Sequence, residues 1–279
     1  MIKKCFAKIN LSLDIISKRP DGYHNIDTLM ARISLYDKLE IEKTTDGKFS
    51  YESNVDLGDV KDNLIFKAYE LMKALAADKA SGIRVRLTKN IPVAAGLAGG
   101  STNCAETMKA LNEMWGLSLT TKQLMDLGAK LGADIPFFFM KSPARATGIG
   151  EILEPFRIKT PLKVLLVNDG TNISSAHVYK KTKLFGHIKT GKIAEGLKAG
   201  DWSVVSDFEN VMEDVVLKDF PQLVPVKENL IKNGAIKALV SGSGASIFGI
   251  FRDEDSLNWA YENLKDSYKF ARKVDLIDD

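Results

Sequence analysis

The chain has 279 residues, of which 45% are hydrophobic and 27% charged, as in an ordinary globular protein with roughly two domains. A net charge of +3, without a basic run interleaved with aromatic residues, argues against a nucleic-acid-binding protein. Two cysteines are too few for a disulfide framework or a zinc site, and we find neither a signal-peptide core nor an apolar segment long enough for a bilayer, so we expect a cytoplasmic protein without a membrane partner.

The first predicted element is a half-buried strand over residues 5–16, where apolar and polar side chains roughly alternate. Lys8 and Asn10 project from one face of this strand. From the residues alone, the preferred interpretation is a solvent-facing pair on an edge strand.

Residues 20–24, with the sequence PDGYH, combine turn-forming residues with Tyr23 and His24. Taken singly, such a tyrosine usually packs and such a histidine usually lies at the surface. A second strand is predicted over 35–43. The Asp-Gly dipeptide after it is typical of a hairpin leading into residues 48–53.

A helical pattern begins at Asp62 and Asn63, where Asp62 fits a plain N-cap. Its predicted apolar face consists of Leu64, Ile65, Ala68, Leu71, Met72 and Leu75. An alternating strand over 83–87 follows, and then Lys89. Both Asn63 and Lys89 fit solvated surface positions.

Residues 91–107, IPVAAGLAGGSTNCAET, form a glycine-rich passage from this strand into a helix. Glycines let backbone N–H groups approach a ligand, and a helix N-terminus favours an anion, so the passage suits a phosphate. Ser101 and Thr102 add hydroxyls that fit a helix cap, phosphate contacts or a metal ligand. The spacing matches neither the Walker A loop nor the dinucleotide fingerprint, and alone it fits a plain helix entry equally well.

Two further helices are predicted, the first ending at Gly116 and the second spanning 121–131. The sequence GADIPFF then places Asp134 between a helix end and an apolar run of three phenylalanines. A carboxylate in such a place needs a partner, because unpaired burial of a charge is costly. A helix-end turn residue is the alternative.

Motifs become sparse around residues 155–161, which predicts one domain over 1–157 and a second over 158–279. In the second domain, residues 236–251 predict two apolar strands about a Ser-Gly-Ser-Gly turn. The other elements expected there are a buried strand at 162–167, helices at 174–184, 193–197, 204–217 and 255–265, and a strand at 270–276.

Three segments resemble the motifs of the GHMP kinases, the superfamily of the galactokinase, homoserine, mevalonate and phosphomevalonate kinases. They are AKINL at 7–11, the passage at 91–107 and SGSG at 241–244, and they occur in the family's order across nearly the whole chain. The run DGYH at 21–24 is typical of the cytidyl-binding members. The resemblance implies an α+β class, with a two-domain GHMP kinase fold. Its N-terminal domain would be ribosomal protein S5 domain 2-like and its C-terminal domain ferredoxin-like.

The same resemblance implies ATP-dependent phosphorylation of the 2-hydroxyl of 4-diphosphocytidyl-2-C-methyl-D-erythritol, with Mg²⁺, by a monomer or weak homodimer. Asp134 would be the catalytic base and Lys8 its partner beside the acceptor hydroxyl. The implied substrate-binding residues are Asn10, Tyr23, His24 and Tyr179, although Tyr179 fits a packing residue of its helix equally well. The implied ATP-binding residues are Asn63 and Lys89 near the adenine, with Pro92, Val93, Ala94, Ala95, Gly96, Leu97, Ala98, Gly99, Gly100, Ser101 and Thr102 around the phosphates; Ser101 is also the candidate metal ligand.

Three positions depart from the family pattern. Ala98 stands where many members have glycine, and because alanine tolerates positive φ poorly we expect an ordinary backbone there. Cys104 and Glu106 stand where the family often has alanines, and Glu106 is expected either to point to solvent or to help hold Mg²⁺. The alternative functions are another GHMP kinase, of mevalonate or homoserine type, and a non-catalytic nucleotide-binding relative.

Overall fold

The computed structural model describes residues 1–183 and 186–278, and these divide into two units. Unit 1 contains Met1–Ala7, Leu35–Ile91 and Ala98–Met140, and unit 2 contains Lys8–Ser34, Pro92–Leu97 and Lys141–Asp279. The long strands β1 (Ile2–Lys18) and β2 (His24–Thr44) contribute residues to both units. This division is discontinuous in sequence, whereas the boundary expected after residue 157 is linear, and that boundary stays a prediction.

In unit 1, the end of β2 pairs antiparallel with β4 (Gly82–Thr88), and β3 (Phe49–Ser53) pairs parallel with β4. The predicted hairpin between β2 and β3 is therefore wrong. β4 occupies the edge of β2 that the hairpin needed, with a register running from Lys38 opposite Thr88 to Thr44 opposite Gly82. The turn residues were correctly identified, but pairing with a strand farther along the chain decided the position of β3.

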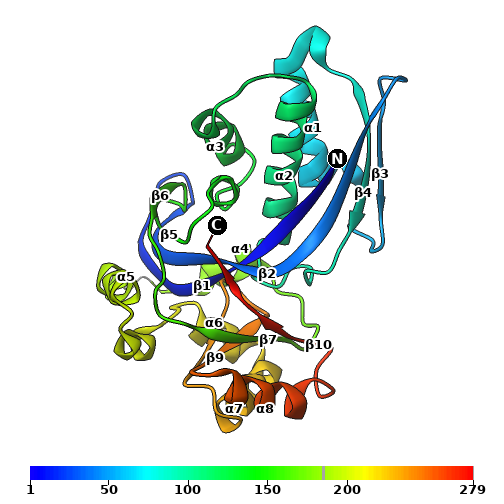
Figure 1. The fold of residues 1–279 in the computed structure, drawn as a ribbon. Coiled ribbons are helices and arrows are strands. Elements are labelled where there is room, and N and C mark those ends of the chain that lie inside the picture. The colour runs from blue at the N-terminus through cyan, green and yellow to red at the C-terminus, as the bar shows by residue number, and fades with distance from the viewer. Residues whose placement is uncertain (184–185, 279) are drawn as a thin grey trace. The chain divides into compact units, whose positions relative to one another are not determined.

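The helices α1 (Leu64–Ala76) and α2 (Gly99–Met114) lie side by side against the strands of unit 1 (Figure 1). Asn63, and not Asp62 as predicted, caps α1, because its side chain accepts a hydrogen bond from the backbone N–H of Ile65. Leu75, expected on the apolar face, is half exposed. The third helix, α3 (Thr121–Ala129), begins with a capping box in which Thr120 and Gln123 satisfy each other's backbone donors.

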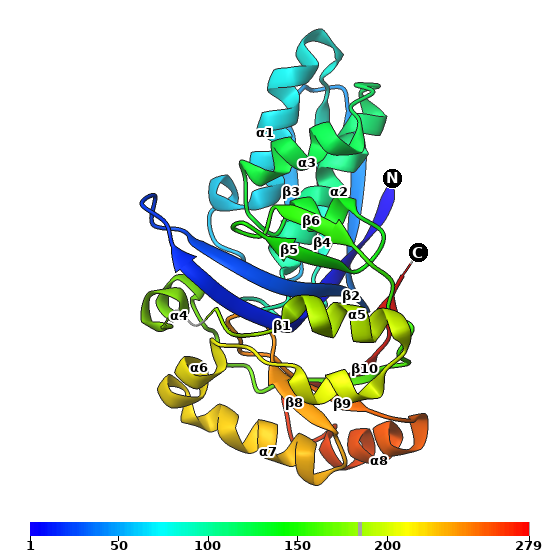
Figure 2. The same cartoon turned by 90° about the vertical axis from the view of Figure 1, so that its left-hand side faces the viewer.

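Unit 2 contains a four-stranded antiparallel sheet in the order β10–β7–β9–β8, with helices α7 and α8 packed against it (Figures 1 and 2). The five residues of β9 are all buried, as expected of a continuous apolar run. The bounds are β7 (Lys163–Asn168), β8 (Lys237–Val240), β9 (Ile247–Phe251), β10 (Phe270–Val274), α7 (Val224–Lys232) and α8 (Glu254–Leu264).

Several short elements of unit 2 were not predicted. They include the hairpin of β5 and β6, which pairs with β2, and helix α7. The expected helix over 204–217 is wrong, because the chain there forms a 3-10 helix and then an extended segment around Asn210 before α6 begins. Leu184, at the end of the expected helix 174–184, lies outside the described residues. The bounds are β5 (Ala144–Thr147), β6 (Ile152–Pro155), β11 (Leu276–Ile277), α4 (Ser175–Lys181), α5 (Thr190–Ala199) and α6 (Glu213–Asp219). The 3-10 helices of the described residues, in both units, are η1 (Val60–Asp62), η2 (Ala77–Lys79), η3 (Pro136–Phe139), η4 (Trp202–Asp207) and η5 (Pro221–Leu223).

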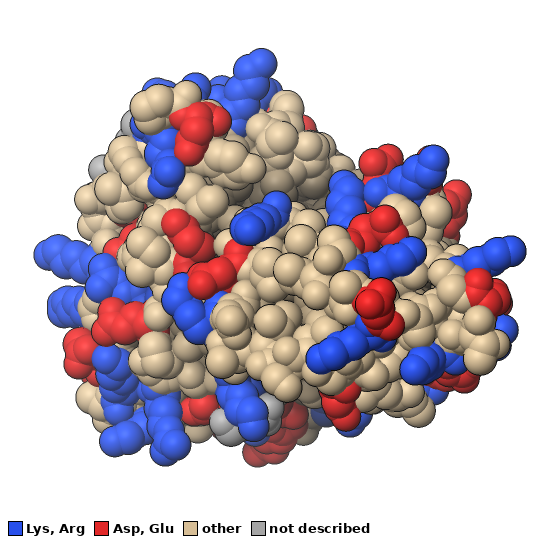
Figure 3. Space-filling view, turned by 90° about the horizontal axis from the view of Figure 1, so that it is seen from above, with Lys and Arg blue, Asp and Glu red and all other residues tan. Residues whose placement is uncertain are grey.

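Charged side chains of both signs are interspersed on the face drawn in Figure 3. This mixing agrees with the small formal net charge of +3. Among the described residues, no helix combines the length and the apolar character that a membrane span requires.

Candidate active site

The first half of the glycine-rich passage, Pro92–Leu97, belongs to unit 2 and is hydrogen-bonded to the Ser-Gly-Ser-Gly turn at 241–244 and the residues after it. The hydroxyl of Ser241 donates to the carbonyl oxygen of Gly96 at 3.0 Å, and the backbone N–H of Ser246 donates to that of Ala95 at 3.2 Å. A Cβ at Gly96 would overlap the carbonyl oxygen of Ser241, and Gly96 has φ of 74°. These two glycine-containing segments are closely packed, and their packing requires glycine at position 96.

The second half of the passage begins α2 in unit 1. Ala98 is the N-cap residue and has φ of 54° and ψ of 34°, so the expectation of an ordinary backbone there is wrong. Its carbonyl oxygen accepts from the N–H of Thr102 at 3.0 Å, which is the first bond of the helix. Entry into α2 therefore holds an alanine in the left-handed region, at a cost of about 1–2 kcal/mol. Ala98 supplies no side-chain cap, so the N–H groups of the first helical turn are suited to an anion.

Lys89 lies beside the start of α2. Its side chain is only 6% exposed and forms an ion pair with the fully buried Asp37. A Cβ at Gly99 would stand 2.8 Å from the Lys89 ammonium nitrogen, so glycine at the first position of α2 leaves room for this charge. The interpretation of Lys89 as a solvated surface residue is therefore wrong.

Lys8 and Asn10 form a buried polar group in unit 2. The Lys8 ammonium donates to Oδ1 of Asn10 at 2.6 Å, and the Asn10 amide donates to the hydroxyl of Thr28 at 2.8 Å. A Cβ at Gly242 would lie 3.3 Å from Oδ1 of Asn10 and 3.5 Å from the Lys8 nitrogen. Lys8 is 4% exposed, so the solvent-facing interpretation of this pair is wrong. The ammonium lies instead beside the glycine turn.

Asn210 is a residue that sequence analysis missed. It is buried, its amide donates to the carbonyl oxygens of Val240 at 2.9 Å and Gly242 at 2.7 Å, and its own Oδ1 accepts from the N–H of Met212 at 3.0 Å. It therefore holds the glycine turn that contacts Lys8 and Asn10. A single asparagine in a stretch of mixed apolar and acidic residues offered no local signal for this role.

His24 and Tyr179 are brought together in unit 2. Their rings stack with centroids 5.5 Å apart and an interplanar angle of 25°. Tyr179 also packs against the hydrophobic core of this unit, whereas the neighbouring Tyr23 is exposed. Partial burial and, secondarily, the charge of Lys18 lower the pKa of His24 below its ordinary value of 6.5. The imidazole is therefore neutral at physiological pH and combines one hydrogen-bond donor with one acceptor.

Asp134 lies in unit 1, half-buried, just before the fully buried 3-10 helix Pro136–Phe139. Its expected partner Lys8 belongs to unit 2, and their pairing stays a prediction. Asn63 uses its carbonyl oxygen to cap α1. No contact in the structure tests its predicted position near the adenine.

Two of the positions that depart from the family pattern, Cys104 and Glu106, lie in α2 within unit 1. Glu106 accepts from the ammonium of Lys109 at 2.7 Å and is 16% exposed, so its expected alternative of pointing to solvent is wrong. Burial raises the pKa of the Cys104 thiol to about 12, which keeps it protonated and unreactive. Within the described part of the chain, no group of three or more histidine, cysteine, aspartate or glutamate residues could hold a metal ion.

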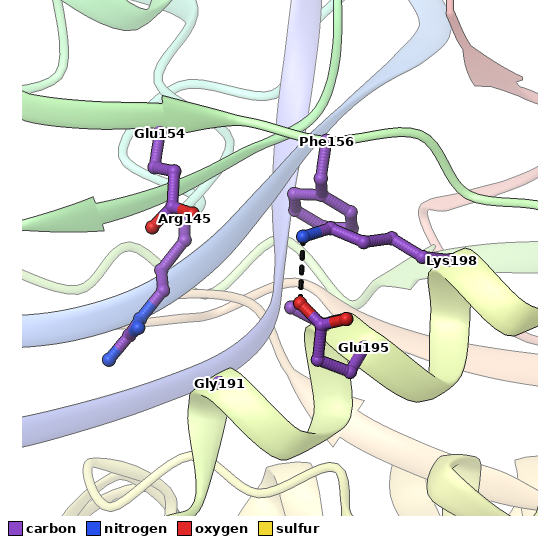
Figure 4. Close-up of a pocket in the computed structure, with 7 residues that line it drawn as sticks. Arg145, Glu154, Phe156, Gly191, Glu195 and Lys198 are labelled. Atoms are coloured by element: carbon purple, nitrogen blue, oxygen red, sulfur yellow. Dashed lines mark hydrogen bonds and ion pairs between the residues drawn. The ribbon is translucent and has the colours of Figure 1, made fainter.

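A small pocket in unit 2 does not correspond to this site (Figure 4). Its cavity volume is about 30 Å³, and its charged residues include Arg145 and Glu154 from the β5–β6 hairpin and Glu195 and Lys198 from α5. Lys198 donates to Glu195 at 2.8 Å, and Arg145 forms an ion pair with Asp27. The space holds a water molecule or two, whereas small-molecule sites typically measure about 300–1,000 Å³.

Known proteins resemble this chain over nearly its whole length. Residues 63–142 match the family model described as GHMP kinases N terminal domain, and residues 193–269 match GHMP kinases C terminal. The chain is 38% identical over 276 residues to the 4-diphosphocytidyl-2-C-methyl-D-erythritol kinase of Alkaliphilus metalliredigens (strain QYMF), covering 97% of this chain and 94% of that protein. It is 39% identical over 273 residues to the enzyme of the same name from Thermoanaerobacter pseudethanolicus, covering 96% and 93%.

Solved structures give the same result. The crystal structure of a 4-(cytidine 5'-diphospho)-2C-methyl-D-erythritol kinase superposes with a TM-score of 0.85 at 30% identity, covering 99% of both chains. The L. major mevalonate kinase in complex with R-mevalonate superposes with a TM-score of 0.72 at 18% identity, covering 99% of this chain and 96% of the other. The second likeness concerns the fold alone.

Proposed function

This chain belongs to the 4-diphosphocytidyl-2-C-methyl-D-erythritol kinases of the GHMP kinase family, and from that premise we propose its reaction and the residues that perform it. The enzyme transfers the terminal phosphoryl group of ATP to the 2-hydroxyl of 4-diphosphocytidyl-2-C-methyl-D-erythritol, giving the 2-phosphate and ADP. This step belongs to the non-mevalonate route to isoprenoid precursors. We place the enzyme in the cytoplasm, since its two free cysteines fit a reducing compartment. In this proposal it acts as a monomer or weak homodimer.

The observation that carries the proposal is the buried ammonium of Lys8. Asn10 holds it, and it lies against the glycine turn at Gly242 rather than in solvent. Burial of a cation is costly, and such groups are frequently kept for chemistry. We assign Lys8 to the acceptor hydroxyl, where its charge stabilises negative charge that develops on the attacking oxygen.

Asp134 accepts the proton of the acceptor hydroxyl in this proposal. Phosphoryl transfer asks mainly for positioning and charge stabilisation, and a carboxylate within hydrogen-bond reach of the hydroxyl orients it and removes its proton. The support for Asp134 is its GADIP context and its half-buried place before an apolar 3-10 helix. Lys8 and Asp134 then act on the same oxygen.

The ATP phosphates bind at the N-terminus of α2 and along residues 92–98. The absence of a side-chain cap on α2 and the left-handed residues Ala94, Gly96 and Ala98 support this assignment. Ser101 and Glu106 are the protein groups that fit a magnesium ion held mainly by phosphate. When bound, Mg²⁺ neutralises phosphate charge. Asn63 and Lys89 are assigned to the adenine side.

The cytidyl group binds beside His24, with Tyr23 and Tyr179 around it and Asn10 facing the substrate phosphates. A neutral imidazole can donate from one nitrogen and accept at the other, which matches the amino donor and ring acceptor of cytosine. The lowered pKa of His24 favours that neutral form. We assign the stacking face to Tyr179.

An ATP-consumption assay across three acceptors tests the function. We expect turnover with the cytidyl methylerythritol substrate and little with mevalonate or homoserine. A preference for mevalonate or homoserine would indicate another GHMP kinase. Nucleotide binding without turnover on any acceptor would indicate a non-catalytic relative.

A further inference from the structure

Asp37 is a fully buried carboxylate that no step of the proposed reaction uses. It lies in β2 within unit 1, far in sequence from the glycine-rich passage. Both of its oxygens are engaged. Oδ1 accepts from the backbone N–H groups of Asn90 at 2.8 Å and Ile91 at 2.9 Å, while Oδ2 accepts from the Lys89 ammonium and from the Asn103 amide at 3.0 Å.

These four donors come from the two sides of residues 92–98, the part of the passage that precedes the helical residues of α2. Asn90 and Ile91 immediately precede residues 92–98, and Asn103 lies in the second turn of α2, which follows them. One carboxylate thus ties the entrance of the passage to the helix at its exit. Because charge-assisted hydrogen bonds are about twice as strong as neutral ones, this connection is a firm one.

The same carboxylate also sets the position of Lys89. The Lys89 ammonium lies between Asp37 and Oδ1 of Asn103, which is 3.4 Å away, and next to Gly99 at the start of α2. Asn54 holds the backbone of Lys89 on the other side, accepting from its N–H at 2.7 Å. The Lys89 ammonium is therefore held in one position, beside the N-terminus of α2.

We propose that Asp37 is a positioning residue for the nucleotide: by holding residues 90–91, the Lys89 ammonium and Asn103 in one arrangement, it preorganises the phosphate-binding end of α2. This inference rests on the proposed function, since it takes α2 as the ATP site. Preorganisation acts on affinity by reducing the ordering that binding must impose. Its loss should appear in ATP binding and leave cytidyl-substrate binding nearly unchanged.

Single substitutions at Asp37 mix two effects of opposite sign. They loosen the passage, which weakens ATP binding, and they leave Lys89 unneutralised near an anion site, which strengthens it. Two double variants separate these effects. Asp37→Asn with Lys89→Met and Asp37→Leu with Lys89→Met both keep the net charge of the natural chain and have similar side-chain volumes. Only the first retains an oxygen that accepts from Asn90 and Ile91.

The measurement is the Kd of a non-hydrolysable ATP analogue and of the cytidyl substrate by calorimetry. We expect the variant with Asp37→Leu to bind the ATP analogue at least about tenfold more weakly than the variant with Asp37→Asn, which corresponds to about 1.4 kcal/mol. Cytidyl-substrate Kd should differ by less than about twofold between them. Equal ATP affinity in the two double variants would overturn the proposal.

Asp14 provides the matched control. It is also a fully buried aspartate that accepts from two backbone N–H groups, those of Gly186 at 3.1 Å and Ile188 at 2.8 Å, but it lies in unit 2, whereas Asp37, Lys89 and Asn103 lie in unit 1. Asp14→Leu should leave the ATP-analogue Kd unchanged. If Asp14→Leu weakened binding of the ATP analogue as much as Asp37→Leu does, the effect would come from a general loosening of the protein, and this result would also overturn the proposal.

If the Asp37→Leu double variant does not fold, Asn103→Ala is tested in its place. This substitution removes the hydrogen bond from the Asn103 amide to Asp37 without leaving a backbone N–H unpaired. A rise of about threefold in the ATP-analogue Kd is then expected, and no rise contradicts the inference. Failure of the natural chain to bind ATP would sink the proposed function itself, which keeps the two failures distinct.

Discussion

Gly96 and Ser241 are in backbone contact within unit 2, although 145 positions separate them in the chain. The Ser241 hydroxyl donates to the Gly96 carbonyl oxygen, and the Ser241 carbonyl oxygen fills the space that a Cβ at Gly96 would need. The carbonyl oxygen of Gly244 lies 3.0 Å from the same position. The glycine-rich passage is thus shaped by residues from the C-terminal half of the sequence, and this contact leads to the first prediction.

Gly96→Ala should abolish measurable ATP binding or prevent folding. The added methyl group would overlap backbone atoms, which cannot move aside by a change of side-chain rotamer. Gly47→Ala is the control, since Gly47 also has a positive φ, of 69°, but has nothing within 4 Å of the added Cβ. Thermal denaturation and ATP-analogue binding should show a loss of about 1–2 kcal/mol in stability for the control and unchanged ATP affinity. Retained ATP affinity in Gly96→Ala would remove the steric argument.

Asp134→Asn should retain the fold and ATP binding while lowering kcat by roughly 10²–10⁴-fold, the usual contribution of a general base. Lys8→Ala should affect the same chemical step. If both residues act on the acceptor oxygen, the loss in the double variant will be smaller than the product of the two single losses. Single-turnover rates measure this, and strictly multiplicative losses would show that the two residues act independently.

Asn210→Asp tests the support of the glycine turn. The carboxylate would face the carbonyl oxygens of Val240 and Gly242, to which the natural amide donates. We expect a loss of about 1–3 kcal/mol in stability, as for unpaired buried polar groups, together with a lower kcat/KM. Asn263→Asp, at an exposed asparagine bonded to Asn233, should change neither quantity. Urea denaturation and steady-state kinetics on both variants provide the comparison.

His24→Ala should weaken binding of the cytidyl substrate by about 1–3 kcal/mol, because polar atoms of the base lose their partner. ATP affinity should stay nearly unchanged. The decisive comparison replaces cytidine by uridine in the substrate, which reverses the donor and acceptor on the base edge. The natural chain should discriminate strongly between the two and His24→Ala weakly. Equal turnover of both substrates by the natural chain would show that His24 does not select the base.

The pH dependence of the cytidyl-substrate KM should follow the same imidazole. Burial lowers the pKa of His24 below 6.5, so the ring gains its proton, and loses its acceptor nitrogen, only when the pH falls below that value. KM should therefore be constant above about pH 6.5 and rise as the solution is made more acidic. His24→Gln, which keeps a donor and an acceptor but does not titrate, should lack this rise. A KM that rises equally in both would assign the pH effect to another group.

The sequence by itself determined the local elements and the family. Period-2 patterns predicted β1 and β4, and continuous apolar runs predicted β7 and β9. A helical period predicted α1, and the glycine-rich passage was placed between a strand and a helix. The motifs also identified the kinase family that the comparisons show. Such features depend on residues that are neighbours in the chain, so periodicity and turn chemistry are sufficient to predict them.

Tertiary structure alone decided which polar residues are buried and what they contact. Lys8 and Lys89 look like surface lysines in the sequence, yet both are buried, because each is paired with residues brought to it by the fold. Ala98 adopts a left-handed conformation that its residue type disfavours, since entry into α2 fixes it there. Asp37 and Asn210 gave no motif at all, because a hydrogen-bonding partner 30 or more positions away leaves no local periodicity.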